Sequence, residues 1–115
     1  MWGLTTVQKY YLYDGVTDMR RSFDALSGMV RAEFGQEPMD GTVYIFINRL
    51  RNQVKLLVWD RSGYLLYHKR LERGTFERIK MSVDGTGFIT WTQLTMVLEG
   101  VSIKNLIHRP RYAHL

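Results

Sequence analysis

Hydrophobic positions along the chain follow two spacings, and the first predicts a helix. Between Met19 and Phe34 they recur at steps of three and four, which places them on one side of a helix over residues 18–34. Thr17 or Asp18 is expected to cap its start, and Gly35 to end it. The apolar stripe consists of Met19, Phe23, Leu26, Val30 and Phe34.

The second spacing is that of extended strands. Residues 9–13 are rich in aromatic side chains that favour strands, and residues 42–48 are apolar on both faces, as in a strand covered from both sides. Residues 54–59 and 64–71 flank a turn at 60–63, which predicts a hairpin. Neither face of its second strand is cleanly apolar, which indicates a role besides packing for one face.

The C-terminal part of the chain shows weaker signals. Residues 79–83 and 87–90 flank turn residues at 84–86, which predicts a second hairpin. The Thr-x-x-Gln pattern at 90–93 matches a capping box and opens a short helix over 91–99, with Gly100 as its expected C-cap. Its expected buried face is Leu94, Val97 and Leu98. The polar segment 102–115 is either a docked arm or a loose tail.

These elements predict the fold class and the domain organisation. We expect an α+β fold in which an antiparallel sheet of four or more strands packs against one N-terminal helix, with a short C-terminal helix on one side. No linker, repeat or low-complexity tract divides the sequence, so residues 1–115 are expected to form a single domain.

Composition narrows the environment of the protein. The chain has no cysteine, so disulfide frameworks and thiolate chemistry are excluded. It has no visible signal peptide and no apolar run near the roughly 18 residues of a spanning helix. We therefore expect a soluble cytoplasmic protein without membrane contacts.

Positive charge is concentrated in one region of the chain. Residues 49–80 hold nine cations and three acids, a net charge of +6, whereas the rest of the chain is at −1. Basic residues at strand spacing neutralise phosphates and favour nucleic-acid binding. The candidate phosphate contacts are Arg49, Arg51, Arg61, Lys69, Arg70 and Arg73, with Arg20 and Arg21, at the start of the predicted helix, as second-rank candidates.

Two other interpretations of this basic region stay open. It is a solvated face that happens to be cationic, or it docks an acidic partner protein, since arginine and aromatic residues are enriched in protein interfaces. Aromatic residues between the cations offer stacking surfaces for unpaired bases, or they simply pack in the core. They are Trp59, Tyr64, Tyr67 and Phe76.

Signs of catalysis are weak. The histidines at 68, 108 and 114 show no metal-ligand spacing, and no phosphate-binding loop or nucleophile motif occurs. A metal-dependent nuclease is the less favoured alternative. Its candidate residues lie around one hairpin and are Asp60, His68 and Glu72. We predict no catalytic residue, no metal and no cofactor.

Two blocks of residues carry a family resemblance. Residues 15–26, GVTDMRRSFDAL, resemble the pattern G-x-T-D-M-R-K-x-F-D-x-L, and residues 55–76 resemble K-x-L-x-W-D…G-x-x-L-Y-x-K-R-L-E-x-G-x-F. Residues 98–101, LEGV, are similar to a closing L-E-G-I. These patterns belong to proteins encoded by the second reading frame of the insertion-sequence sixty-six family, the TnpB type of that family and not the RNA-guided nucleases of the same name. Many members have Trp-Pro after the last aromatic residue, where this chain has Glu77-Arg78.

The resemblance implies a non-catalytic accessory factor for the transposition of a bacterial mobile element. The implied partners are DNA at the element ends, the cognate transposase, or both, and the basic hairpin is the expected contact. A protein–protein adaptor without DNA contact is the alternative. The oligomeric state does not follow from the sequence.

Overall fold

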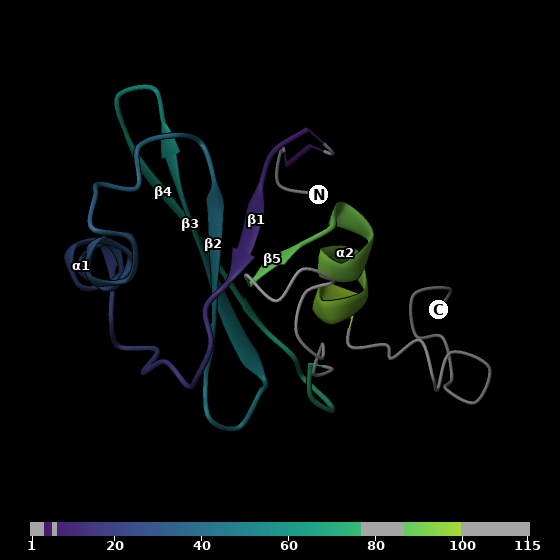
Figure 1. Cartoon of the computed structure of the whole chain (residues 1–115). Coiled ribbons are helices and arrows are strands. Elements are labelled where there is room, and N and C mark those ends of the chain that lie inside the picture. The colour runs from purple at the N-terminus through teal and green to yellow at the C-terminus, as the bar shows by residue number, and fades with distance from the viewer. Residues whose placement is uncertain (1–3, 6, 77–86, 100–115) are drawn as a thin grey trace.

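A five-stranded sheet forms the centre of the molecule in the computed structural model, which describes residues 4–5, 7–76 and 87–99. The strands lie in the order β4-β3-β2-β1-β5, as Figure 1 shows. In chain order the elements are β1 (Tyr10–Leu12), α1 (Phe23–Phe34), β2 (Val43–Ile47), β3 (Gln53–Asp60), β4 (Gly63–Arg70), β5 (Phe88–Ile89) and α2 (Trp91–Glu99).

The sheet is mixed, so the prediction of an antiparallel sheet is wrong at one pair of strands. β1 runs parallel to β2, with Tyr10 opposite Val43, whereas the β2–β3, β3–β4 and β1–β5 pairs are antiparallel. The segment between β1 and β2 contains α1 and returns the chain to its starting end, and such a crossover is what a parallel pair requires.

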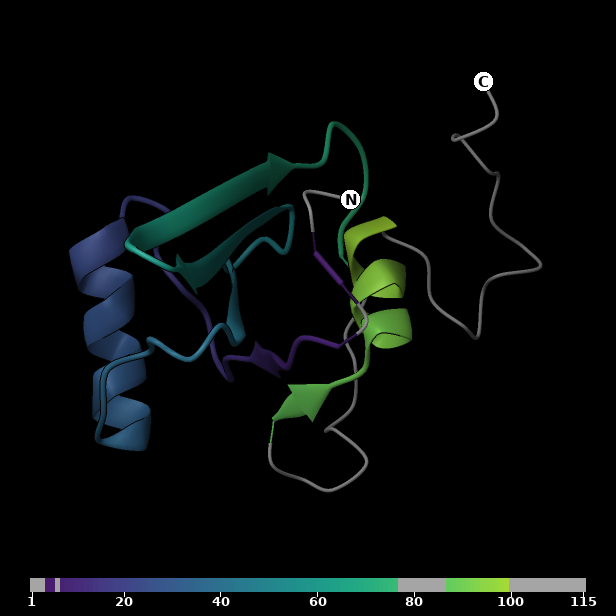
Figure 2. The ribbon, with the colours of Figure 1, turned by 90° about the horizontal axis from the view of Figure 1, so that it is seen from above.

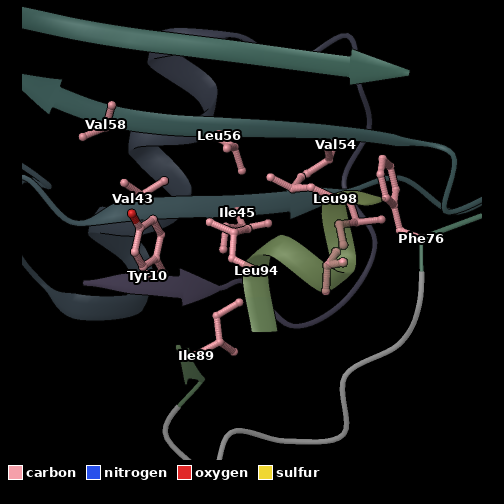
Figure 3. Packing of buried hydrophobic residues seen from close by; sticks show 12 residues of the cluster. Tyr10, Val43, Ile45, Val54, Leu56, Val58, Phe76, Ile89, Leu94 and Leu98 are labelled. Carbon is pink, nitrogen blue, oxygen red and sulfur yellow. The ribbon is translucent and has the colours of Figure 1, made fainter. Parts of the chain in front are cut away.

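One helix covers each face of the sheet, as Figure 2 shows. The face toward α2 carries the larger core, with side chains from every strand but β4 buried in it (Figure 3). This cluster is made of Tyr10, Val43, Ile45, Ile47, Val54, Leu56, Val58, Phe76, Ile89, Leu94, Val97 and Leu98. The predicted buried face of the short helix is thereby confirmed.

The face toward α1 carries the second core. Its buried members are Tyr11, Leu26, Val30, Tyr44, Phe46 and Leu57. Because both faces are covered, all five residues of β2 are buried, which confirms the prediction of a central strand.

Helix α1 starts later than the sequence predicts. Its N-cap is Ser22, and neither expected cap serves it. The amide of Thr17 donates to the carbonyl of Ile47 at 2.9 Å, and the carboxylate of Asp18 accepts the amide of Arg20 at 2.9 Å. Phe23, expected on the buried stripe, is 43% exposed. At the other end, Gly35 adopts a left-handed conformation and its amide donates to the carbonyl of Arg31. The predicted end of the helix at Gly35 is thereby confirmed.

The start of α2 matches the prediction. The amide of Thr90 donates to Oε1 of Gln93 at 2.8 Å, and the amide of Gln93 donates back to Oγ1 of Thr90 at 3.1 Å. β5 pairs with β1. The predicted strand at 79–83, its turn at 84–86, the Gly100 cap and the segment 102–115 lie outside the described residues.

Candidate functional site

Five of the predicted phosphate contacts meet at one end of the sheet. The β2–β3 turn carries Arg49 and Arg51, and the last residue of β4, Arg70, lies opposite Gln53, directly after that turn. The amide of Leu71 donates to the carbonyl of Asn52 at 2.8 Å, so the segment after β4 stays beside the turn. We call this region, with Arg49, Arg51, Lys69, Arg70 and Arg73, the basic end.

Arg61 does not join the basic end. It lies in the β3–β4 turn, beyond the pair of Asp60 with Gly63. Seven residue steps along the hairpin separate that pair from the pair of Gln53 with Arg70, which is about 23 Å at the rise of a strand. The six first-rank candidate phosphate contacts are therefore divided between two distant ends of the hairpin.

The side chain of Asn48 holds the β2–β3 turn in shape. Its Oδ1 accepts the amides of Asn52 and Gln53 at 3.0 and 2.9 Å, and its Nδ2 donates to Oδ1 of Asn52 at 2.8 Å. These bonds fix the loop that carries Arg49 and Arg51. Asn48 is not among the predicted site residues, although an asparagine directly after a strand is a turn signal.

Arg51 is bound to the backbone of the neighbouring loop. Its Nε donates to the carbonyl of Phe76 at 3.1 Å, and its own carbonyl accepts the amide of Phe76 at 2.6 Å. Its φ of 56° is left-handed. Arg51 therefore joins the turn to the end of the segment after β4, where Phe76 enters the core.

Lys69 connects β4 to α2. Its Nζ donates to the carbonyl of Leu98 at 2.8 Å, in the last turn of the helix. Carbonyls in the last turn of a helix have no partner within it, and the helix dipole favours a cation there. Lys69 thus has a structural role that the sequence did not indicate.

The remaining cations of the basic end are open to solvent. Arg49, Arg70 and Arg73 are all exposed. Within the described residues, Arg49 and Arg73 form no side-chain hydrogen bond or ion pair, and Arg70 has only Glu72 at 3.8 Å. That pair is exposed on both sides, so water and salt screen it.

Arg20 and Arg21 lie before α1 and not in its first turn. The Arg20 guanidinium binds the carboxylate of Asp18 at 2.6 Å, and this contact holds the pKa of Asp18 far below its usual range. The pair is neutral overall. The carbonyl of Arg21 accepts a bond from Nζ of Lys55 at 2.6 Å.

Lys55 is a buried cation that we did not predict as a site. It is 7% exposed, and no described carboxylate lies within ion-pair distance of it. His68 lies opposite it on β4 and binds Oε1 of Gln53 through Nε2 at 2.8 Å. Partial burial and the charges of Lys55 and Arg70 lower the pKa of His68.

A shallow polar hollow lies beside the basic end. It has a volume of about 420 Å³ and lies between the loop before α1 and the β2–β3 turn. Its lining is Val16, Thr17, Asp18, Met19, Asn48, Arg49, Leu50 and Gln53. With one arginine and one aspartate among these residues, the hollow has no net charge of its own.

The acidic residues of the alternative nuclease site do not converge. Asp60 closes the hairpin turn, whereas His68 and Glu72 lie toward or beyond the other end of β4. In the described ranges, no group of three or more histidine, cysteine or acidic residues is arranged to hold a metal ion.

The aromatic residues lie mainly away from the basic end. Trp59 and Tyr64 form an edge-to-face pair at 5.0 Å near the hairpin turn. Phe76 is 1% exposed and belongs to the core, as the packing interpretation predicted. Tyr67 packs against the core on the α2 side. Base stacking interleaved with the phosphate contacts therefore has no support in this geometry.

The geometry thus gives an exposed basic end on a small α+β domain. A family model described as IS66 Orf2 like protein matches residues 8–108. The chain belongs to this family. Membership links the protein to a general accessory role in the transposition of an insertion sequence.

One similar curated protein is the uncharacterized protein y4hO of Sinorhizobium fredii. It is 32% identical over 94 residues, which cover 81% of this chain and 80% of y4hO. No solved structure matches the chain.

Among the helices of the described residues, none has the length and apolar character needed to cross a membrane.

Proposed function

We propose that this family member assists transposition by binding element DNA through its basic end. Arg49, Arg70 and Arg73 make the main phosphate contacts. The observation that carries the proposal is the gathering of these three exposed arginines on a turn and a loop that Asn48 and Arg51 hold in place. Fixed cations need less ordering on binding than cations on loose segments.

Phosphate contacts of this kind give affinity that depends on salt and hardly on sequence. Each contact releases condensed counterions, so the slope of log K against log salt changes by about 0.9 per phosphate on duplex DNA. Arg51 and Lys69 add positive potential near the backbone, while their own side chains stay on the protein's carbonyls.

The test is DNA binding by charge-reversal variants, measured by fluorescence anisotropy with labelled element-end duplex. We expect Arg49→Glu, Arg70→Glu and Arg73→Glu each to weaken binding about tenfold and to flatten the salt slope. Arg61→Glu is the matched control, because it changes the net charge equally at the far end of the hairpin. We expect it to weaken binding about twofold.

Two results would count against this proposal. The first is an absence of binding by the wild-type chain at low salt. The second is an equal loss in all four variants, because that pattern reports net charge and not a site.

Docking of the transposase at the same surface is the second candidate, and the exposure of Leu50 favours it. This leucine is 70% exposed in the β2–β3 turn, between Arg49 and Arg51. An apolar side chain flanked by arginines is typical of protein interfaces and adds nothing to phosphate binding. A pull-down of the transposase after nuclease treatment tests it, and Leu50→Gln, which adds no charge, should abolish capture while leaving DNA affinity intact.

A further inference from the structure

Strand β4 forms an open edge of the sheet. Figures 1 and 2 show it on the outside, and in the part of the chain that the structure describes no strand pairs with its outer side. All eight of its residues pair with β3 in unbroken register, so the strand has no bulge and contains no proline. It is the longest regular edge that the described sheet offers.

The register shows which backbone groups face outward. The amide of Leu71 donates to Asn52 on the β3 side, and bonding partners alternate along an antiparallel pair. The odd-numbered residues of β4 therefore bond to β3. The amides and carbonyls that point away from the sheet belong to Tyr64, Leu66, His68 and Arg70.

Natural edge strands are commonly protected by charged residues, prolines or bulges. In β4 the charges are confined to its last two residues, Lys69 and Arg70, and residues 63–68 carry no acid, lysine or arginine. Leu65 is 40% exposed on this strand. The depressed pKa of His68 favours its neutral form near pH 7. Most of the edge is thus uncharged, and no described strand occupies its outer side.

We propose that β4 pairs with β4 of a second copy of this chain, antiparallel about a two-fold axis at Leu66. Outward-facing residues then meet in bonded pairs, with Leu66 opposite its counterpart and Tyr64 opposite His68 of the second copy. On the other face, Leu65 lies opposite Tyr67. The two sheets become one continuous sheet of ten strands.

The distribution of charge selects this occupant and this direction. In the antiparallel arrangement Arg70 lies beside Ser62 of the second copy, in a turn whose charges, Asp60 and Arg61, sum to zero. The two Arg70 residues are then eight positions apart along the strands, about 27 Å, well beyond the screening length of about 8 Å at physiological salt. Parallel pairing would instead place the two cationic ends side by side. An acidic strand would find no complementary charge along 63–68.

The test begins with the mass of the full chain in solution, by light scattering or sedimentation equilibrium at up to about 100 µM. We expect twice the protomer mass of 13.6 kDa. His68→Pro removes an outward amide that β3 does not use, and should give a monomer with unchanged circular dichroism. Because proline can also disturb the strand, Leu65→Lys serves as a second variant.

Leu50→Lys is the matched control for Leu65→Lys, since both replace an exposed leucine and only Leu65 lies on the edge. We expect Leu65→Lys to weaken the dimer at least about tenfold through a charge placed among apolar neighbours, and Leu50→Lys to leave it unchanged. A wild-type monomer over the whole concentration range overturns the proposal. So does a dimer that persists in both edge variants.

The absence of cysteine allows the register to be tested directly. Directly opposed bonded residues have Cα atoms about 5.5 Å apart, within the range that a disulfide spans. Leu66→Cys should therefore form a cross-linked dimer on mild oxidation. Tyr64→Cys, about 13 Å from its counterpart in this register, should not. Cross-linking through position 64 and not through 66 would contradict the proposed axis.

Discussion

Three lysine and arginine side chains near the basic end are bound to carbonyls of the protein itself. Lys55 binds Arg21, Arg51 binds Phe76 and Lys69 binds Leu98. Each bond joins the sheet to a segment at least 25 positions away in the chain. A charge count cannot separate these cations from those facing solvent, because the difference lies in distant partners. This is why the sequence predicted Arg51 and Lys69 as phosphate contacts equivalent to Arg70.

The bond of Lys69 gives the first residue-scale prediction. Lys69→Met keeps the aliphatic stem and removes the ammonium, leaving the last turn of α2 without its cation. We expect a loss of about 1–2 kcal/mol in the free energy of unfolding, measured in urea. Arg70→Met, whose partner is exposed, should change stability by less than about 0.5 kcal/mol. Equal losses in both variants would show that the bond to Leu98 contributes nothing.

His68 gives a prediction about pH. Its folded-state pKa is below the ordinary value of 6.5, because of partial burial and the charges of Lys55 across the strand pair and Arg70 on its own strand. Below 6.5 the unfolded chain therefore binds more protons than the folded one. The contribution of His68 to the free energy of unfolding is therefore complete above pH 6.5. It is lost as the pH falls toward the folded-state pKa.

Urea midpoints at pH 7.5 and pH 5.5 check this. The decrease between them should be smaller in His68→Gln, which has no titrating group and retains an amide to bind Gln53. An identical decrease in the wild type would mean that His68 does not contribute to the pH dependence.

At the scale of elements, the contact between β1 and β5 depends on a close approach at Gly87. The amide of Leu12 donates to the carbonyl of Gly87 at 2.9 Å. A Cβ at Gly87 would lie 2.6 Å from Cε2 of Tyr11, and its φ of +98° is one that side chains rarely adopt. Position 87 therefore requires glycine for two separate reasons.

We expect Gly87→Ala to lower the free energy of unfolding by about 2–3 kcal/mol. Gly74→Ala is the control, because Gly74 has a φ of +73° and nothing within 4 Å of the added Cβ. It should cost only about 1 kcal/mol. Thermal or urea unfolding separates the two, and equal losses would show that Tyr11 moves aside at no cost.

The elements with local signals were predicted correctly from the sequence. The capping box of α2, the turn of the β3–β4 hairpin and the buried β2 each depend on residues close together in the chain. The direction of β1 was missed, although a strand, a helix and a strand in succession is the order of a parallel crossover. The start of α1 was missed because Thr17 bonds to the end of β2 instead of to the helix.

The candidate site was predicted in part. The length of the strands explains why Arg61 is not part of it. The turn carrying Arg49 and the end of β4 carrying Arg70 come together because the strands between them are antiparallel. Eight residues per strand place Arg61 at the far end. That separation follows from the sequence once the hairpin boundaries are known, whereas the role of Asn48 requires the positions of its bonding partners.

At the scale of the whole molecule, charge is distributed unevenly. The basic end carries five cations and one nearby acid, Glu72, whereas the β3–β4 turn holds Arg61 beside Asp60, so the described part of the hairpin is more positive at the basic end than at its turn. Such an asymmetry orients a molecule as it approaches a polyanion and raises the rate of productive encounter. In the proposed two-fold pair the basic ends point away from each other, so both stay available to DNA.

The strand order has a consequence for how the protein folds. β2, β3 and β4 follow one another within residues 43–70, so their pairing closes only short loops. β1 pairs with β5 across 77 positions, between Tyr11 and Phe88. Closing so long a loop costs entropy that only a preformed sheet edge can offset. The three-stranded meander is therefore the expected folding nucleus, and β1, β5 and α2 complete the domain late, as the part that opens first under stress.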